Sequence, residues 1–411
     1  MFSIRLGIKN LSRQKRRNII TILVIAFAFF GYLFLESLLN GMEEMSFDNI
    51  RDFETGDIQI AHPEYWPERK ELPLDHLVEW NEIINDEIEK IKGVSGVSPE
   101  LRFSANLNNG IDEMGVIGLG IIPENYNQVF KTQDYFSEGS LFALNENKAV
   151  IGERMAELMD LKMNDYIILL VRTREDTFNT IEVEIGGIVK TLNPIINSTI
   201  VLLPLHLVQQ ALNTENNVSM VSLKTNFGQE ELAQQSIHEY FREEGLPLEA
   251  YSWRESAESV IALSTTKKSA IGIIMSVVLL IGMVGIINNI ILSALERTSE
   301  IGMMKALGMK EWEIVFVFMV EAAGIGVMGG LAGCLLGFLG VNWLVNNGFY
   351  IEAWGDMTQY GIPILDRIYG VWNYYSFGYI FFLGVIVAIL SSIFPAYWAA
   401  HKDPVEAIYQ R

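Results

Sequence analysis

The most chemically distinctive stretch of the sequence is residues 295–314, LERTSEIGMMKALGMKEWEI, which lies between two long apolar runs. Ile301, Met304, Leu307 and Ile314 recur along it at roughly helical steps. Its charged residues are Glu296, Arg297, Glu300, Lys305, Lys310, Glu311 and Glu313. An amphipathic helix of this kind can pack one face against membrane or protein and offer charges on the other. We therefore predict that this stretch is the amphipathic tip of a hairpin, at a membrane face.

Catalytic chemistry has little support in the sequence. The five histidines show no HExxH spacing, and they are His62, His76, His206, His238 and His401. The single cysteine, Cys334, allows neither an intrachain disulfide nor a multi-cysteine metal site. No GxxxxGK[ST] loop is present to cradle nucleotide phosphates. We expect no catalytic residue, cofactor or metal on this chain, and an enzyme is the weakest function class.

The composition indicates a membrane protein with a large water-exposed part. Half of the 411 residues are hydrophobic, yet 19% are charged. A membrane-spanning helix needs roughly 20 apolar residues. Four segments qualify, at residues 19–39, 270–294, 314–345 and 377–395. We therefore predict an α-helical membrane protein with four transmembrane helices and a two-lobed α+β extracytoplasmic domain inserted between the first two helices.

Basic residues near the ends of the spans predict the orientation. Residues 1–18 hold six Lys and Arg and no acid, which favours a cytoplasmic N-terminus. Four crossings then return residues 396–411 to the cytoplasm. The segments 40–269 and 346–376 would lie outside, with 42 acidic against 19 basic residues. This acidity argues against nucleic acid as a partner. Lys267 and Lys268 lie just outside the second span and are an exception to the rule that basic residues are found on the cytoplasmic side.

Residues 1–18 have two interpretations. Apolar residues are spaced among their charges, so they could form an amphipathic helix that binds anionic membrane lipid. They could equally be a plain topology signal.

Alternating and helical patterns predict the outer domain, residues 40–269. Helical spacing continues beyond Leu39, so the first span would project as a stalk that Thr55 and Gly56 end. Leu77 to Ile91 predict an amphipathic helix, and strands and short helices follow. The simplest arrangement is an α+β lobe built from both ends of the domain, with a mostly β lobe inserted at about residues 132–213.

The third span, with its cytoplasmic end, contains two candidate features. Gly329, Gly333 and Gly337 lie four residues apart, a spacing that lets helices approach closely in lipid, within the chain or against another subunit. Glu321 is the acid expected within the membrane. A functional role and a local hydrogen-bonding role are equally compatible with its position.

The loop at residues 346–376 is rich in aromatic residues, including Trp354, Tyr360 and Trp372. Such residues are typical of a belt at the level of the lipid headgroups. A surface that contacts cargo in the outer leaflet is the alternative.

Two segments carry a family resemblance. ERTSEIGMMKALGM, followed by Glu321, and the tail PAYWAAHKDPVEAI resemble the signatures of FtsX/MacB-type ABC transporter permeases. In the outer domain, GDIQIAHPEYW and VIGERMAELMDLKMNDYIILL are similar to segments of the lipoprotein-releasing permeases LolC and LolE.

The resemblance implies that residues 295–313 form a cytoplasmic coupling helix, which receives force from a separate ABC ATPase dimer that binds ATP and Mg. The residues assigned to this helix are Glu296, Arg297, Glu300, Ile301, Lys305, Leu307 and Gly308. It also implies a bacterial inner (cytoplasmic) membrane location and a second permease subunit, identical or paralogous. A periplasmic lipoprotein carrier or adaptor could be a further partner. MacB carries a fused N-terminal ATPase, for which this sequence shows no motif.

Two functions follow from the resemblance. The first is a permease subunit that transmits force to its outer domain, for lipoprotein release or for export of a periplasmic substrate. The second is an FtsX-like membrane regulator of a cell-wall hydrolase that transports no cargo. Release of lipid-anchored protein from vesicles would distinguish them.

Overall fold

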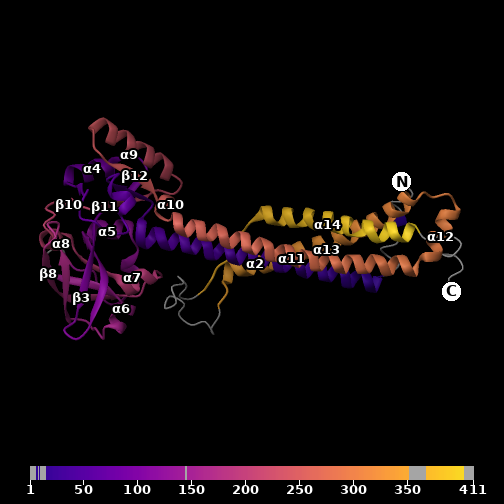
Figure 1. The fold of residues 1–411 in the computed structure, drawn as a ribbon, viewed down its shortest axis with the longest axis horizontal. Helices are drawn as coiled ribbons and strands as arrows, with labels where there is room; N and C mark the ends of the chain where they lie inside the picture. The colour runs from indigo at the N-terminus through magenta and orange to yellow at the C-terminus, as the bar shows by residue number, and fades with distance from the viewer. Residues whose placement is uncertain (1–5, 8, 10–14, 144–145, 351–366, 402–411) are drawn as a thin grey trace. The chain divides into compact units, whose positions relative to one another are not determined.

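The computed structural model describes residues 6–7, 9, 15–143, 146–350 and 367–401. The chain divides into two units. We call the first the helical unit, made of residues 1–43, 263–350 and 367–411, and the second the sheet unit, made of residues 44–262 and 351–366. Figure 1 labels their elements.

Five helices with described bounds belong to the helical unit. They are α2 (Lys15–Ile50), α11 (Glu258–Glu296), α12 (Thr298–Ala306), α13 (Glu311–Asn347) and α14 (Tyr374–Ala400). Within the described residues, three helical stretches are long and apolar enough to cross a membrane, namely Lys15–Thr55, Glu311–Asn347 and Tyr374–Ala400. The first extends beyond the predicted span of residues 19–39 in both directions.

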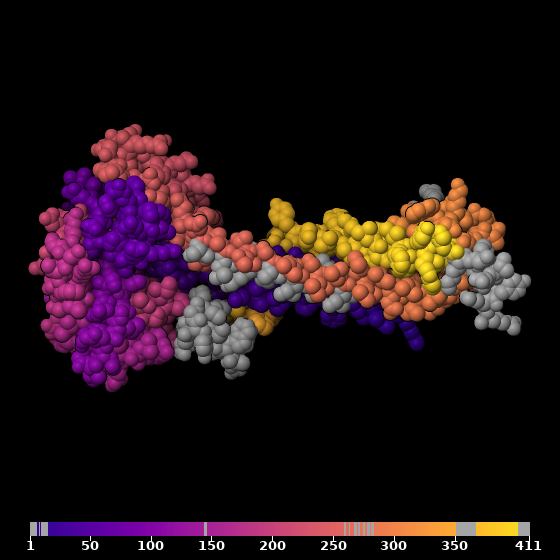
Figure 2. All heavy atoms as spheres, viewed as in Figure 1, coloured from indigo at the N-terminus to yellow at the C-terminus, as the bar shows by residue number. Residues whose placement is uncertain are grey.

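Helices α13 and α14 pack lengthwise against each other. Figure 2 shows α14 (yellow) open along much of its length, and apolar side chains such as Phe382 and Phe394 are exposed on it. Such a surface is expected of a helix that faces lipid rather than water. Both helices are therefore long and apolar enough to cross a membrane, as their sequences predict.

The first helix ends where the sequence predicts. After α2 the chain makes one turn of π-helix, η1 (Arg51–Thr55). Gly56 follows with φ +65°, and a Cβ there would lie 2.7 Å from the carbonyl oxygen of Leu223. Because only glycine combines this backbone conformation with that close approach, the predicted end at Thr55 and Gly56 is confirmed.

The sheet unit is built on one ten-stranded sheet, with β2 (Val78–Glu79) and β10 (Asn217–Val218) paired separately. The order of the main path is β12-β1-β11-β3-β4-β9-β6-β8-β5, and β7 pairs with β3 and β8. Its strands are β1 (Ile58–Ala61), β3 (Val94–Asn108), β4 (Glu113–Ile121), β5 (Phe136–Gly139), β6 (Lys148–Gly152), β7 (Tyr166–Arg172), β8 (Phe178–Val189), β9 (Ile200–Pro204), β11 (Met220–Thr225) and β12 (Glu249–Ser252).

Helices cover this sheet. They are α3 (Tyr65–Glu68), α4 (Glu82–Lys90), α5 (Pro123–Val129), α6 (Glu153–Leu158), α7 (Pro194–Thr199), α8 (Leu205–Leu212), α9 (Glu230–Glu244) and α10 (Trp253–Ser256), with the 3-10 turn η2 (Thr132–Tyr135). α4 packs against β3 and α9 against β12. The buried face of β7 alternates as its sequence predicts, with Ile167, Leu169 and Val171 in the core.

Strand order is the feature that the sequence left open. The segment expected as an inserted lobe, residues 132–213, contains β5 to β9. β9 pairs in parallel with β4, and β7 pairs with β3. The two lobes therefore share one sheet, since the backbone groups of β3 and β4 are satisfied by strands of the inserted segment.

One predicted helix begins later than its apolar pattern suggested. Leu77 lies outside any helix and Trp80 follows β2, whereas α4 begins after Asn81. The Asn81 side chain accepts a hydrogen bond from the backbone N–H of Ile84 at 3.0 Å. The prediction of helix from Leu77 is wrong because this cap and the pairing of β2 with β10 fix the chain as a strand before Asn81.

Candidate functional site

The turn between α11 and α13 is the candidate functional site. The single helix expected over residues 295–313 is wrong in extent, because α12 spans only Thr298–Ala306. Arg297 leaves helical geometry, with φ −116° and ψ 24°. Gly308 adopts φ +91°, which favours glycine, and the backbone N–H of Lys310 donates to Glu313 Oε2 at 2.9 Å as α13 begins.

Arg297 connects the turn to the following helix. Its Nε lies 3.0 Å from Glu300 Oε2 on α12, and its Nη1 lies 3.3 Å from Glu321 Oε2 on α13. The Glu321 side chain is 1% exposed, and Ser293 Oγ donates to its other oxygen at 3.5 Å. A carboxylate this deeply buried needs a cation and hydrogen bonds to offset its desolvation. Glu321 and Arg297, predicted separately, therefore form one ion pair.

The first helix, α2, forms hydrogen bonds with the C-terminal part of α11. Arg17 Nη1 donates to Glu296 Oε2 at 3.0 Å. One turn further into α2, Asn289 Nδ2 donates to the buried hydroxyl of Thr21 at 2.6 Å. The sequence reasoning missed Thr21 and Asn289, although a polar pair inside two apolar helices is a recognisable signal.

The start of α13 is held by two longer ion pairs. Lys305 Nζ lies 3.6 Å from Glu311 Oε1, and His401 Nε2 lies 3.3 Å from Glu311 Oε2. Glu311 thus lies between α12 and the end of α14. Its side chain is half exposed, so each contact contributes little to stability.

The apolar residues of the turn divide into two groups. Ile301 is buried among the helices of this unit. Leu307 is 85% exposed, and Met303 and Trp312 are also exposed. A helix and turn that present apolar side chains outside a membrane-spanning segment are typical of a protein interface. Leu307 and Gly308 are therefore at the surface, while Ile301 positions the turn.

The three glycines lie against the first helix. A Cβ at Gly329 would be 2.9 Å from Ile25, and one at Gly333 would be 2.6 Å from the Cβ of Phe29. The Gly337 position is closer still to a side chain of α2. The row thus packs within the chain, and the absent side chains let α13 approach α2.

The aromatic candidates are only partly covered. Trp354 and Tyr360 lie outside the described residues. The Trp372 ring stacks on Tyr374, with 5.5 Å between centroids, and lies 5.2 Å from the Phe338 ring. This placement of Trp372 in an aromatic group on the helical unit is compatible with a headgroup belt.

The sheet unit has a cavity of about 290 Å³ with buried charges in its wall. Arg102 Nη2 lies 2.7 Å from Glu100 Oε2, and the Glu100 side chain is fully buried. The same Nη2 donates to the backbone oxygen of Glu54 at 2.7 Å. Burial raises the pKa of the Glu54 carboxyl, and the hydrogen bond from Asn193 and the charge of Arg102, which lower the pKa, only partly offset this effect. The remaining wall is largely apolar, so the cavity is amphiphilic.

Comparison with known families gives the class of the protein. Residues 19–238 match the MacB-like periplasmic core domain, and residues 272–404 match the FtsX-like permease C-terminal domain. The chain belongs to the FtsX/MacB-type ABC transporter permeases.

Particular relatives cover its whole length. It is 24% identical to an uncharacterized ABC transporter permease of Methanocaldococcus jannaschii, over 98% of this chain and 97% of that one. It is 23% identical to the uncharacterized ABC transporter permease YknZ of Bacillus subtilis, over 99% and 98%. With the macrolide export ATP-binding/permease protein MacB 2 of Aeromonas hydrophila the identity is 24%, over 98% of this chain but 60% of that protein.

Two solved structures are similar to about half of the chain. The extracellular domain of YknZ aligns over 48% of this chain and all of its own length, with 14% identity and a TM-score of 0.36. The periplasmic region of MacB from Actinobacillus actinomycetemcomitans aligns over 52% of this chain and 96% of its own, with 13% identity and a TM-score of 0.38.

Proposed function

We propose that this chain is a permease subunit that receives force from a separate cytoplasmic ATPase dimer at the turn 298–312 and passes it to the sheet unit. The ATP and Mg would be bound by that partner. The observation that carries the proposal is the Arg297–Glu321 ion pair, which joins α12 to a buried position on α13. Because the Arg17–Glu296 pair joins α2 to α11 at the same turn, a push there would displace all these helices together.

The topology proposed with this function has four crossings. α11 is a continuous helix of 39 residues whose apolar stretch at residues 270–294 would be the second crossing. The six basic residues before residue 18 favour a cytoplasmic N-terminus, and an even number of crossings would return the C-terminus to the same side. The membrane would be the bacterial inner membrane.

Two helices would carry the motion outward. The chain passes between the two units at residues 43–44 and 262–263, and these positions fall inside α2 and α11. A hydrogen bond from Ser264 to the Glu43 carboxylate joins the two helices there. A helix resists bending and stretching because its backbone bonds are internal, so the pair would act as a stiff relay.

The cargo proposed is a lipoprotein to be released from the membrane, or a periplasmic substrate to be exported. The support is the resemblance of the outer segments to LolC and LolE and the name of the MacB relative, which describes macrolide export by that protein. A second permease subunit and a periplasmic carrier would complete the assembly. Vesicles that hold the purified complex should release a lipid-anchored protein on ATP addition. Binding of a cell-wall hydrolase without release would favour the regulatory role instead.

Capture of the ATPase tests the proposal. The full chain, purified from its own cells in mild detergent, should bring an ATP-binding protein with it. Leu307→Asp should remove that partner, because it places a charge where the exposed side chain would be buried. The matched control is Leu158→Asp, at an exposed leucine of the sheet unit, which should leave capture unchanged. Capture that survives Leu307→Asp would contradict the proposed contact.

A further inference from the structure

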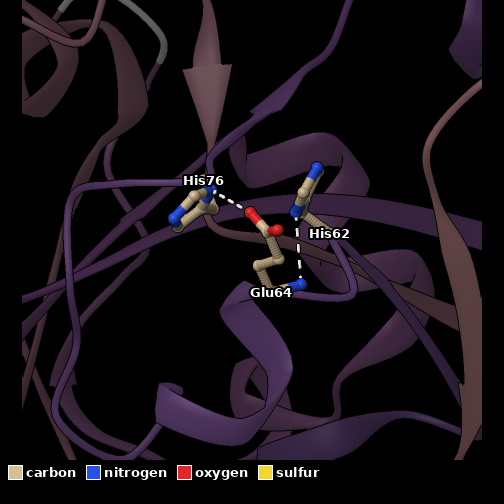
Figure 3. Close-up of side chains that lie close together, drawn as sticks. All are labelled: His62, Glu64 and His76. Atoms are coloured by element: carbon tan, nitrogen blue, oxygen red, sulfur yellow. Dashed lines mark hydrogen bonds and ion pairs between the residues drawn. The ribbon is translucent and has the colours of Figure 1, made fainter.

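Two histidines and a glutamate converge on one face of the sheet unit. His76 Nδ1 lies 2.9 Å from Glu64 Oε2, and the rings of His62 and His76 stack with 5.4 Å between centroids. One ligand atom from each of the three side chains lies within 4.8 Å of the other two. Figure 3 shows the Glu64 carboxylate between the two imidazoles.

The local backbone holds these side chains in place. His62 follows β1, and its carbonyl oxygen accepts hydrogen bonds from the N–H groups of Tyr65 and Trp66 at 3.0 and 3.2 Å. Glu64 is the residue before α3. His76 has φ +54°, a left-handed conformation that is unfavourable for a residue with a side chain. The three residues are thus positioned by a turn, a helix start and a strained backbone position.

We propose that His62, Glu64 and His76 bind a divalent transition-metal ion of the Zn²⁺ class, with water in the fourth position. Two imidazoles and one carboxylate are a ligand set that Zn²⁺ adopts, and tetrahedral ligands lie roughly 3.3 Å apart. For all three groups to coordinate one ion, the carboxylate and each imidazole would need to move by about an ångström or less. The His76 and Glu64 side chains are exposed by 48% and 67%, which leaves water access to the open position.

The ion would replace two existing contacts. It would take the place of the His76–Glu64 ion pair, and of the hydrogen bond that the Glu64 backbone N–H donates to His62 Nδ1 at 3.2 Å. Both imidazoles must be unprotonated at the nitrogen that binds. The spacing of the histidines in the sequence does not predict such a site, because 13 residues, which include the short helix α3, lie between His62 and His76.

The segment that the ion would close forms part of the wall of the amphiphilic cavity. Arg69, Lys70 and Leu72 line it. Trp66 stacks on Tyr251 with 3.7 Å between centroids, and the Arg69 guanidinium lies 4.1 Å from the Trp66 ring centre. A metal bridge between residues 62 and 76 removes conformational freedom from this segment. The site would therefore restrict the segment that carries Arg69 and Lys70 in the cavity wall.

Calorimetry on the full chain in detergent tests the site. The protein, purified without a polyhistidine tag and stripped of metal, should bind one Zn²⁺ and show no comparable heat with Mg²⁺. His62→Gln and His76→Asn should each weaken binding by roughly tenfold or more. Asparagine is chosen at residue 76 because it tolerates the left-handed backbone. The matched control, His206→Gln, removes an exposed histidine of the same unit and should bind like the parent.

A Co²⁺ spectrum gives a second readout that does not depend on stability. Nitrogen ligation in the proposed site should produce a visible absorption band with the parent and with His206→Gln, and no such band with His62→Gln. Circular dichroism should be the same for all variants. Absence of Zn²⁺ binding by the parent, or binding that both histidine variants retain, would overturn the proposal.

Discussion

The helical unit and the sheet unit each bury a carboxylate against an arginine, but one pair joins two segments of the chain and the other lies within a single strand. Glu321 and Arg297 are 24 residues apart and join α13 to the turn before α12. Glu100 and Arg102 are two residues apart on the same strand, β3. A pair between elements strains or breaks when they move, whereas a pair within a strand moves as one body. Under the proposed function, the pair in the helical unit would respond to motion, and the pair in the sheet unit would move with its strand.

Packing differs in the same way. In the sheet unit, aliphatic side chains fill one large core, and backbone groups pair across the sheet. In the helical unit, the contact between α13 and α2 depends on residues with no side chain, such as Gly333. The missing side chains let α13 approach α2 closely, and side chains of α2 such as Phe29 occupy the space. Under the proposed function, the helices would move and the sheet would stay rigid.

Removing Arg297 should have the largest effect. Arg297→Gln leaves the Glu321 carboxylate buried without its cation, and the loss of stability should be about 3–5 kcal/mol. Thermal unfolding in detergent measures it. In the double variant with Glu321→Gln, much of the loss should be recovered, because no buried charge is then left unpaired. A double variant as unstable as the sum of the single ones would show that the two residues do not interact.

Arg102→Gln sharpens the contrast. It should also destabilise the protein, by about 3 kcal/mol, because Glu100 is fully buried. ATPase capture and ATP-driven activity per folded molecule should stay closer to the parent level than with Arg297→Gln, since Glu100 and Arg102 lie on one strand and only the hydrogen bond from Arg102 to the Glu54 backbone reaches the end of the first helix. Arg297→Gln should lower both. Equal uncoupling by the two variants would remove the distinction between the two pairs.

A side chain in the glycine row should act through packing. Gly333→Leu would force atoms against the Phe29 Cβ and against the carbonyl oxygen of Ala26, 3.0 Å from the added Cβ, and should cost about 1–3 kcal/mol. Gly31→Leu is the control, because nothing lies within 4 Å of a Cβ there. The melting temperatures of the two variants should differ clearly. Equal values would mean that α13 does not approach α2 in this way.

The smallest expected effect is a pH dependence in the sheet unit. Burial raises the pKa of Glu54 in the folded state, so its contribution to stability is present below the unfolded pKa and is lost as pH rises through the folded value. Glu54→Gln has no such loss. The stability of Glu54→Gln relative to the parent should therefore improve as pH rises above the ordinary pKa of a glutamate. A difference that stays constant with pH would contradict the raised pKa.

The sequence predicted local features well and long-range ones poorly. Period-two patterns located most strands, and the end of the first helix at Gly56 followed from residue types. The sharing of one sheet by both lobes depends on which distant strands hydrogen-bond, and no local pattern encodes that. The break at residues 307–310 was missed because the apolar spacing continues through it, although Gly308 marks it.

The candidate site shows the same limit. Arg297, Glu300 and Glu321 were chosen from the resemblance and from their place in apolar runs, but their contacts came only with the fold. The pairing of Arg17 with Glu296 spans 279 residues and leaves no trace in either segment alone. His62 and His76 are adjacent only because a loop folds back to place them so.

The side of the membrane on which the turn lies is the most direct test of the account. Cys334 is the only cysteine, so Cys334→Ser gives a background in which Leu307→Cys, at an exposed position, is the single thiol. A membrane-impermeant maleimide should label it in inside-out vesicles stripped of peripheral proteins, so that no ATPase covers the site, and leave it unlabelled in intact cells. Labelling in intact cells would place the turn outside, and no cytoplasmic ATPase could then act on it.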